Sequence, residues 1–232
     1  MPNRCQPYLG VAPTEAVKLY VIMSPVGPYY PEGFKPIRLL ADTVNARAWP
    51  GSIGWAKAGA NYASTILPAV EAQRNHGCQQ VLWLYSDKHY ATEVGAMNIF
   101  FLLEKPDGSG KELVTCPLTR GDILPGVTRQ SVLDLAREWD ECEVSERDIG
   151  LPEIKQAADE GRLLEVFGTG TAAVVAPVRA ISYLGQDIVV PTGAEIGQLA
   201  DRVWNTLTDI QYGRVAGHPW AVRASFSRQR PD

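Results

Sequence analysis

The stretch EVGAMNIFFLLEKPDGSGKELVT, residues 93–115, contains the clearest signal for the fold. Two runs rich in apolar and strand-favouring residues, 93–104 and 111–115, are joined by the turn-forming sequence PDGSG. This arrangement predicts two antiparallel strands connected as a hairpin, because glycine and aspartate permit the backbone conformations that a tight connection needs.

Helices and further strands are predicted on both sides of this hairpin. The pattern indicates strands over 81–85, 144–147, 165–167, 173–183 and 188–190. It indicates helices over 62–75, from the segment 124–129 to residue 139, over 151–160 and over 194–210. Pro68 should bend the first helix, and Gly77 stands where a C-terminal glycine is expected. Because the elements alternate without a strict βαβ order, we expect an α+β fold around a largely antiparallel or barrel-like sheet.

The N-terminal region differs from the rest of the chain. Residues 17–24, VKLYVIMS, predict a buried strand. The following PVGPYYPEGFKP, residues 25–36, contains too many prolines and glycines to continue a strand or a helix. One strand cannot form a core. It therefore either joins the main sheet or is the last part of another domain.

Composition limits the classes of protein to which the chain can belong. With 232 residues, of which 45% are hydrophobic, it can bury a full core. The net charge of −4 and the lack of a basic run argue against a general surface for nucleic acids or anionic membranes. The four cysteines are scattered without metal-ligand spacing, so we expect reduced thiols and no metal site. No apolar run reaches the ~20 residues of a membrane helix.

Lys57 is the first candidate for chemistry. It is the only cation in GSIGWAKAGANY, residues 51–62. Burial there would lower its pKa and leave a fraction of free amine, which favours a Schiff base with a carbonyl group. The ordinary alternative is a lysine whose stem lies on apolar surface while its ammonium reaches water.

Two segments are suited to hold an anion. In LPGVTR, residues 124–129, a glycine precedes a helix start, where the N–H groups of Val127 and Thr128 have no helical partner. The alternative is an ordinary helix start with Thr128 as its N-cap. In FGTGTAA, residues 167–173, small residues allow backbone N–H groups to approach a ligand, although a tight turn between strands explains the pattern equally.

Glu93 completes the candidate group. A carboxylate at the head of an apolar strand is costly to bury unless it meets a cation, and a protonated heterocyclic nitrogen is such a cation. The alternatives are an exposed position or an ion pair with Arg129 or Arg162. Taken together, a lone lysine, an acid and two anion-binding segments describe pyridoxal 5′-phosphate.

Several motifs make the chain recognisable. They are KAGANY (57–62), QQVLWLY (79–85), TEVGAMNIF (92–100), LPGVTR (124–129), EVFGTGTA (165–172) and DIQYG (209–213). In this order they closely resemble the branched-chain amino-acid aminotransferases, which are class IV, pyridoxal-phosphate-dependent enzymes of fold type IV. LGVAP (9–13) and SPVGPYY (24–30) also resemble the end of that family's small domain.

The resemblance implies roles for the candidate residues. Lys57 matches the Schiff-base lysine, which also moves the proton of the substrate α-carbon. Tyr62 matches the tyrosine at the phenolic oxygen of the cofactor, and Glu93 matches the acid at the pyridine nitrogen. The remaining matches are cofactor contacts at Val127, Thr128, Gly170 and Thr171, and substrate contacts at Ala96, Thr171 and Ala172.

The implied reaction is reversible amino transfer from leucine, isoleucine or valine to 2-oxoglutarate, as part of branched-chain amino-acid biosynthesis or catabolism. The resemblance implies a homodimer in the cytoplasm or the mitochondrion, with amino acids and 2-oxo acids as partners and no nucleic acid or membrane. The alternatives are a truncated cofactor-binding domain with little turnover, a D-amino-acid aminotransferase or an aminodeoxychorismate lyase.

The match also implies a division of the chain and some departures from the family. We expect the end of a small domain over 1–30, a linker over 31–38, the large cofactor-binding domain over 39–225 and a tail over 226–232. The small domain's substrate-side tyrosine and arginine and its phosphate-binding arginine have no counterpart here. Ala60 replaces a usual glycine, Ala96 replaces a threonine or glycine, and Ala173 and Ala176 replace the paired cysteines of mammalian members.

Overall fold

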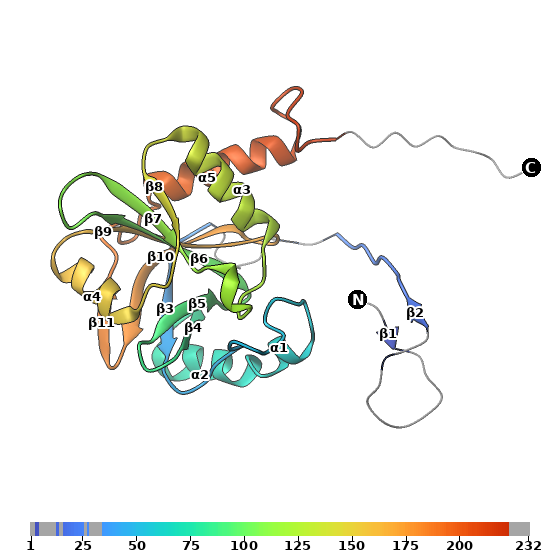
Figure 1. Ribbon diagram of the computed structural model, residues 1–232, viewed down its shortest axis with the longest axis horizontal. Coiled ribbons are helices and arrows are strands. Elements are labelled where there is room, and N and C mark those ends of the chain that lie inside the picture. Colours follow the sequence, from blue (N-terminus) through green and yellow to red (C-terminus); the bar gives the residue numbers. More distant parts are fainter. Residues whose placement is uncertain (1–2, 5–12, 14–15, 26, 28–33, 223–232) are drawn as a thin grey trace, which may run out of the picture.

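A closed ring of six strands forms the centre of the molecule (Figure 1). The computed structural model describes residues 3–4, 13, 16–25, 27 and 34–222. The ring consists of β3 (Ile37–Asp42), β4 (Gln80–Tyr85), β5 (Tyr90–Val94), β6 (Met97–Glu104), β9 (Leu163–Gly170) and β10 (Val174–Tyr183). β9 closes it, because β9 pairs with both β6 and β10. The pairs β10–β3 and β3–β4 are parallel and the others are antiparallel, which confirms the predicted α+β fold with a barrel-like sheet.

Three further strands extend the ring. They are β7 (Lys111–Thr115), β8 (Glu143–Glu146) and β11 (Gln186–Val189). β7 pairs antiparallel with β6, which confirms the predicted hairpin. The prediction of one continuous strand over 93–104 was wrong, because Val94 pairs with Met97 across a tight turn. Gly95 adopts a φ of 58° there, a conformation that glycine takes without steric cost.

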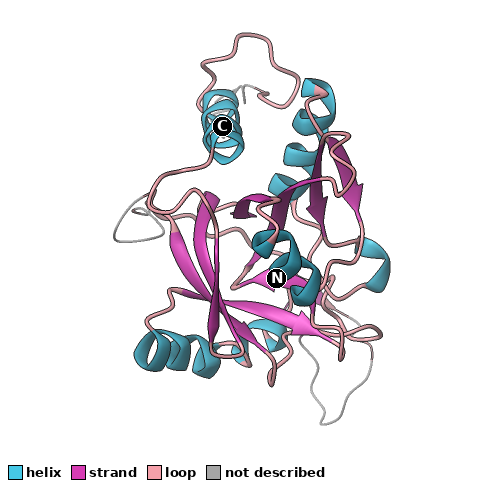
Figure 2. Cartoon of the chain, turned by 90° about the vertical axis from the view of Figure 1, so that its left-hand side faces the viewer, coloured by secondary structure: helices cyan, strands magenta, loops and turns pink. Residues whose placement is uncertain are grey.

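Helices lie around the outside of the strands (Figure 2). They are α1 (Ala60–Ala63), α2 (Ile66–His76), the 3-10 helix η1 (Leu118–Arg120), α3 (Val127–Trp139), α4 (Leu151–Asp159) and α5 (Gln198–Gln211). α3 and α5 contact each other and both contact β9, while α2 packs on β4 and α4 on β11 and β9. The long helices were predicted, with boundaries that differ by a few residues.

The helix predicted over 62–75 is instead two helices. The chain leaves α1 at Ser64 and enters α2 after Thr65, while Pro68 lies in the first turn of α2, where a missing N–H removes no helical bond. Pro68 is therefore buried at the start of α2 and not in the middle of one helix over 62–75. Ile66, the first residue of α2, is exposed. Gly77 ends α2 in the left-handed conformation, as predicted.

Successive side chains of β6 alternate between two hydrophobic clusters. Ile99, Phe101 and Leu103 belong to the larger cluster, which the ring strands share. Phe100 and Leu102 belong to a second cluster that includes the buried faces of α3 and α5. This alternation follows from the two-residue period of a strand. A strand that is apolar on both faces is therefore buried between the ring interior and the helices.

The structure corrects the prediction for residues 17–24. Residues 16–25 are all exposed, and β2 (Val17–Lys18) pairs with β1 (Asn3–Arg4) rather than with the ring. β3 starts at Ile37, within the segment predicted as a linker. Most of the motif over 9–13 and the tail over 226–232 lie outside the described residues. The domain boundaries stay a prediction.

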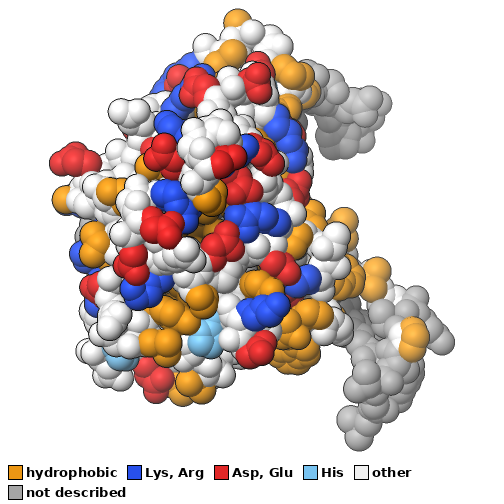
Figure 3. All heavy atoms as spheres, turned by 60° about the vertical axis from the view of Figure 1, so that its left-hand side comes forward, with side chains coloured by type: hydrophobic (Ala, Val, Ile, Leu, Met, Phe, Trp, Pro, Cys, Tyr) orange, Lys and Arg blue, Asp and Glu red, His pale blue; other side chains and the backbone are white. Residues whose placement is uncertain are grey.

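The surface carries both signs of charge. On the face shown in Figure 3, acidic and basic side chains are interspersed. This is the mixture expected from a net charge of −4 without a basic run. Within the described part of the chain, no helix combines the length and the apolar character needed to cross a membrane.

Candidate active site

Lys57 lies in the loop between β3 and α1, and this loop is held from both sides. The buried Asn61 side chain donates hydrogen bonds to the carbonyl oxygens of Ile53 (2.8 Å) and Ala56 (2.9 Å). On the other side, the Trp55 N–H donates to Gly121 O at 3.1 Å. The backbone on the N-terminal side of Lys57 is therefore fixed by the nearby Asn61 side chain and by one backbone bond to a residue that is distant in the sequence.

The side chain of Lys57 is exposed, so the prediction of a buried lysine was wrong. It takes part in no ion pair with another described residue. Lys57 nevertheless lies close enough to Glu93 to favour ionisation of its carboxylate. Ala60, the replacement for a usual glycine, is the first residue of α1 and has no positive φ.

Glu93 is buried on β5, with 2% of its side chain exposed. Its Oε2 lies 3.1 Å from Nε of Arg47, which is fully buried, in an ion pair without hydrogen-bond geometry. The alternatives considered from sequence were wrong, because Arg129 and Arg162 pair with other glutamates. Burial raises the pKa of Glu93 to about 7, while Arg47 and the Leu124 N–H oppose this rise.

Tyr62 and Arg47 belong to the same group of charges. Burial raises the pKa of the Tyr62 phenol, the Glu93 carboxylate raises it further, and Arg47 acts in the opposite direction. Arg47 Nη2 donates to Asp122 O at 2.7 Å, whereas its Nη1 is buried without a hydrogen-bond partner among the described residues. The structure thus places Lys57 and Tyr62 each within electrostatic reach of Glu93, which pairs with a buried arginine.

The start of α3 is attached to this group through Leu124. The Leu124 N–H donates to Glu93 Oε1 at 2.6 Å, and Asn98 Nδ2 donates to Leu124 O at 2.9 Å. The N-cap of α3 is Gly126, not Thr128, and no side chain caps this end of the helix. The N–H groups of Val127 and Thr128 are therefore without helical acceptors, as predicted for an anion site.

The second predicted anion segment lies beside β6. Thr169 of β9 is the cross-strand partner of Asn98, and its buried hydroxyl has no hydrogen-bond partner among the described residues. A Cβ added to Gly170 would lie 3.1 Å from Met97 Cγ and 4.0 Å from Ala96 O. The end of β9 therefore lies close to the turn at Ala96, and the turn that follows β9 contains Thr171 and Ala172. The side chains of Thr171 and Ala172 are exposed.

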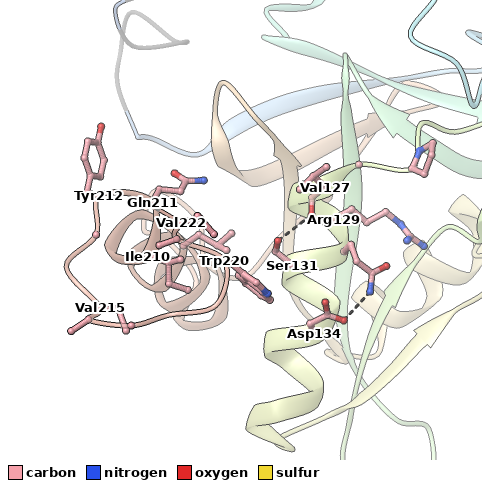
Figure 4. A pocket seen from close by; sticks show the side chains of 18 of the residues that line it. Val127, Arg129, Ser131, Asp134, Ile210, Gln211, Tyr212, Val215, Trp220 and Val222 are labelled. Atoms are coloured by element: carbon pink, nitrogen blue, oxygen red, sulfur yellow. Dashed lines mark hydrogen bonds between the residues drawn. The ribbon is translucent and has the colours of Figure 1, made fainter. Parts of the chain in front are cut away.

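A pocket of about 1490 Å³ borders the start of α3 on another side (Figure 4). One wall is formed by α3, with Val127, Ser131 and Asp134, and the facing wall by the end of α5 and the following segment, with Ile210 and Trp220. Lys57, Tyr62 and Glu93 do not line it. Among the described residues, the start of α3 is therefore the only part of the chain that borders both this pocket and the polar group around Glu93.

Sequence reasoning missed three residues of the site. Arg47 belongs to no motif that we recognised, and its pairing with Glu93 joins residues far apart in the chain. Asn98 is a polar residue within the apolar run of β6, and that contrast was the available signal. Thr169 lies within a segment already selected, but its place opposite Asn98 depends on strand register, which a single sequence does not reveal.

The residues present fit pyridoxal 5′-phosphate. The group needs an amine for its aldehyde, an acceptor for its ring nitrogen and donors for its phosphate. Lys57, Glu93 and the uncapped start of α3 offer these three functions. The buried Arg47 Nη1 and Thr169 Oγ1, which lack partners among the described residues, are further polar atoms that a ligand could satisfy.

Comparison with known proteins agrees with this assignment. The family model for class IV amino-transferases matches residues 3–181, and the chain belongs to this family. Among its relatives is a branched-chain-amino-acid aminotransferase of Monosiga brevicollis, 50% identical over 215 residues, which are 92% of this chain and 54% of that protein.

Further relatives carry the same name. The mitochondrial branched-chain-amino-acid aminotransferase of Mus musculus is 49% identical over 219 residues, covering 94% of this chain and 55% of that protein. A cytosolic form from the same organism also matches, so both predicted compartments are represented among the relatives. The chain spans about half the length of the curated relatives it matches.

Solved structures of the same kind share the fold. The branched-chain amino acid aminotransferase of Escherichia coli superposes with a TM-score of 0.68 at 30% identity, covering 85% of this chain and 59% of that one. A second branched-chain amino acid aminotransferase, solved with pyridoxamine 5′-phosphate, gives a TM-score of 0.65 at 25% identity, covering 84% of this chain and 57% of that one. A bound form of the expected cofactor is therefore known in a structural relative.

Proposed function

We propose that this chain forms the pyridoxal 5′-phosphate-binding part of a branched-chain amino-acid aminotransferase. The reaction is reversible transfer of the amino group of leucine, isoleucine or valine to 2-oxoglutarate. The names of relatives that are 47–50% identical support the substrate class. The observation that carries the proposal is the buried Glu93 carboxylate with Lys57 and Tyr62 within electrostatic reach.

Each residue has a chemical role in the proposal. When bound, pyridoxal 5′-phosphate supplies a ring that accepts the electrons released at the substrate α-carbon. Lys57 Nζ would hold the aldehyde until the substrate amine displaces it, and the freed amine would then take the proton from the substrate α-carbon and return it later. The Tyr62 hydroxyl donates a hydrogen bond to the phenolic oxygen, and the Glu93 carboxylate accepts one from the ring nitrogen.

The ionisation of Glu93 suits this role. Its pKa of about 7 in the ligand-free chain results from burial, which opposes the charged form. A cationic ring nitrogen placed at the carboxylate favours the charged form and lowers this pKa. Binding therefore keeps Glu93 ionised at neutral pH, and the ionised Glu93 in turn keeps the ring nitrogen protonated.

Other backbone segments of the site would hold the phosphate and the substrate. The N–H groups of Val127 and Thr128 bind the phosphate at the positive end of the α3 dipole, and the turn with Gly170 and Thr171 adds further donors. Ala96, Thr171 and Ala172 line the substrate side. The small side chain of Ala96 leaves room beside the turn of β5 and β6.

The test is covalent labelling of Lys57. Purified protein is mixed with pyridoxal 5′-phosphate, reduced with borohydride and digested, and the label is located by mass spectrometry. We expect the label at Lys57, none at that peptide in Lys57→Ala, and an unchanged label in Lys111→Ala, a matched exposed lysine on β7. A wild-type chain without label at Lys57 would contradict the proposed cofactor.

Turnover is tested separately. With leucine and 2-oxoglutarate, the wild type loaded with cofactor should form glutamate and Lys57→Ala should not. A chain that is labelled at Lys57 but forms no glutamate supports the alternative of a cofactor-binding domain without turnover. Branched-chain substrates should be preferred over D-amino acids, and the reverse order would favour a D-amino-acid aminotransferase.

A homodimer is part of the proposal. Trp49, Ile53 and Trp55 are exposed in and beside the loop that carries Lys57, and exposed apolar side chains around a functional loop favour burial against a second copy. Light scattering should give twice the chain mass of 25.4 kDa. A monomer that still binds the cofactor would remove the dimer from the proposal and leave the cofactor site in place.

A further inference from the structure

A row of polar side chains crosses three strands of the ring. Glu93 of β5 pairs with Asn98 of β6, and Asn98 pairs with Thr169 of β9. Side chains of directly paired residues lie on the same face of a sheet. All three residues are buried, with exposed fractions of 2%, 5% and 1%. Such a row in a largely apolar ring is costly unless its groups have partners.

Glu93 and Asn98 both form hydrogen bonds with the backbone of Leu124. Glu93 Oε1 accepts the Leu124 N–H at 2.6 Å, and Asn98 Nδ2 donates to Leu124 O at 2.9 Å. A neighbouring strand would satisfy the same two backbone groups in the same way. Both backbone polar groups of Leu124 are thus bonded by side chains, although this residue lies in a loop.

Asn98 also touches the residue at which α3 begins. A Cβ added to Gly126 would lie 2.2 Å from Asn98 Oδ1, a distance that two unbonded atoms cannot adopt. The φ of −68° and ψ of 135° at Gly126 are open to any residue. A side chain at this position would therefore have to displace Asn98, although the backbone conformation itself accepts any residue.

The segment that Glu93 and Asn98 hold leads directly to the first N–H groups of α3, which have no helical acceptor. The first helical bond described here runs from the Gln130 N–H to Gly126 O, and Gly126 offers no side-chain cap. The N–H groups of Val127 and Thr128 are left for a ligand. Donors that are held in place before binding lose less entropy when an anion arrives, which strengthens the interaction.

We propose that Asn98 is a positioning residue for the phosphate end of the cofactor site, where it holds Leu124 and Gly126 so that the N–H groups of Val127 and Thr128 face the phosphate. This inference deepens the proposed function and rests on it for the identity of the ligand. Asn98 does not itself contact the phosphate. Glu93 supports the same loop from the ring-nitrogen end, so one cross-strand pair connects both ends of the site.

Inorganic phosphate is the probe that tests this role. It is titrated into the full chain while the backbone amide NMR signals of Val127 and Thr128 are followed. Asn98→Ala should raise the phosphate concentration at the midpoint by roughly 3- to 10-fold, the usual effect of one hydrogen bond. The matched control is Thr115→Val, which removes another buried bond, from Thr115 Oγ1 to the carbonyl of Ile99 (2.6 Å), and should keep the wild-type midpoint.

Gly126→Ala provides a second test that does not depend on the folding of Asn98→Ala. Its backbone conformation accepts alanine, and the residue lies in a loop, so the new methyl acts mainly by displacing Asn98. It should weaken phosphate binding to a similar degree. Three results would each overturn the proposal. Both variants could keep the wild-type midpoint, Thr115→Val could lose as much phosphate affinity as Asn98→Ala, or the wild-type signals could fail to respond to phosphate.

Failure of this proposal is distinguishable from failure of the proposed function. If phosphate shifts the Val127 and Thr128 signals through Asn98 but Lys57 takes no covalent label, the positioning role stands and the assigned cofactor does not. If Lys57 is labelled and Asn98→Ala binds pyridoxal 5′-phosphate and pyridoxal with unchanged relative affinity, the cofactor stands and the positioning role is wrong.

Discussion

The protonation of Glu93 links the chemistry of the site to the stability of the chain. In the unfolded chain this carboxyl has its ordinary pKa of 4.5, and burial in the fold raises the pKa to about 7. The folded chain therefore binds the proton more tightly than the unfolded chain does. Ionisation between these two values favours unfolding, so the stability contributed by the protonated form is lost as the pH rises.

This difference predicts a specific pH dependence for the ligand-free chain. Between pH 4.5 and pH 8 the wild type should lose ~3 kcal/mol of stability relative to Glu93→Gln, because each pKa unit corresponds to ~1.4 kcal/mol. Urea unfolding of both proteins at the two pH values measures this change. Parallel pH profiles for wild type and variant would contradict a raised pKa at Glu93.

The ion pair between Arg47 and Glu93 should show strong coupling. Arg47→Met leaves a buried carboxylate without its cation and should cost ~3–5 kcal/mol at pH 8. Adding Glu93→Gln should recover part of that loss, with a coupling of ~1–3 kcal/mol in the double-mutant cycle. The exposed pair Lys155–Asp159 on α4 is the control and should couple by less than ~0.5 kcal/mol. Additive effects at Arg47 and Glu93 would show that the pair is not maintained in solution.

At the residue scale, the sequence predicted site residues only where a single residue is chemically unusual among its neighbours. A lone lysine in a small-residue loop and an acid on an apolar strand stand out, and Lys57 and Glu93 were selected on that basis. The burial of Lys57 was predicted wrongly because its neighbours are apolar in sequence but exposed in the fold. Arg47 was not selected, because its function depends on a contact between distant strands and loops.

At the element scale, the N-terminus of α5 depends on a carboxylate from β9. Glu165 accepts hydrogen bonds from the Leu199 N–H (3.0 Å) and the Ala200 N–H (3.1 Å). Gly197 is the N-cap, and a Cβ there would lie 2.2 Å from Glu165 Oε2. A long-range side chain thus replaces the local N-cap that a helix usually has.

Removal of this cap should loosen α5 before the ring. Glu165→Ala should cost about 2 kcal/mol, because a charge-assisted cap is lost and two helix N–H groups become unsatisfied in a buried place. Hydrogen exchange should accelerate in the first turn of α5 more than in β3 or β4. Glu195→Ala, which removes an exposed acid near the same helix end, should leave exchange unchanged. Uniform acceleration in both variants would contradict a specific cap.

The elements that sequence reasoning misplaced have a common cause. The turn at Gly95 and Ala96 joins two largely buried strands directly, so no polar segment separates β5 from β6 in the sequence. The break after α1 has no glycine or proline at Ser64 or Thr65, and the proline that is present lies inside α2. Long helices and the β6–β7 hairpin were predicted, because their signals are local and repeated.

At the scale of the whole molecule, closure of the ring joins strands that are far apart in the sequence. β3 lies between β10 and β4, so Leu39 pairs with Ile181 on one side and with Gln80 on the other. The resemblance to fold type IV implied a barrel-like mixed sheet, whereas the order of the elements alone left largely antiparallel and barrel-like sheets open. Strand order depends on pairings across most of the chain, and local sequence patterns contain no information about them.

Truncation tests how much of the N-terminal region the ring requires. Residues 16–25 are exposed, and β2 pairs with β1 rather than with the ring, so a chain of residues 34–232 should unfold within a few degrees of the full chain. Removing residues 34–42 as well deletes β3, which opens the ring and exposes the paired edges of β10 and β4. That shorter chain should not fold cooperatively, because an open ring leaves unpaired backbone groups and part of the larger hydrophobic cluster in water.

Thermal unfolding followed by circular dichroism separates the two cases. A large loss of stability in the 34–232 chain would show that residues before Phe34 belong to the folded unit, and cooperative unfolding of the 43–232 chain would contradict a ring that depends on β3.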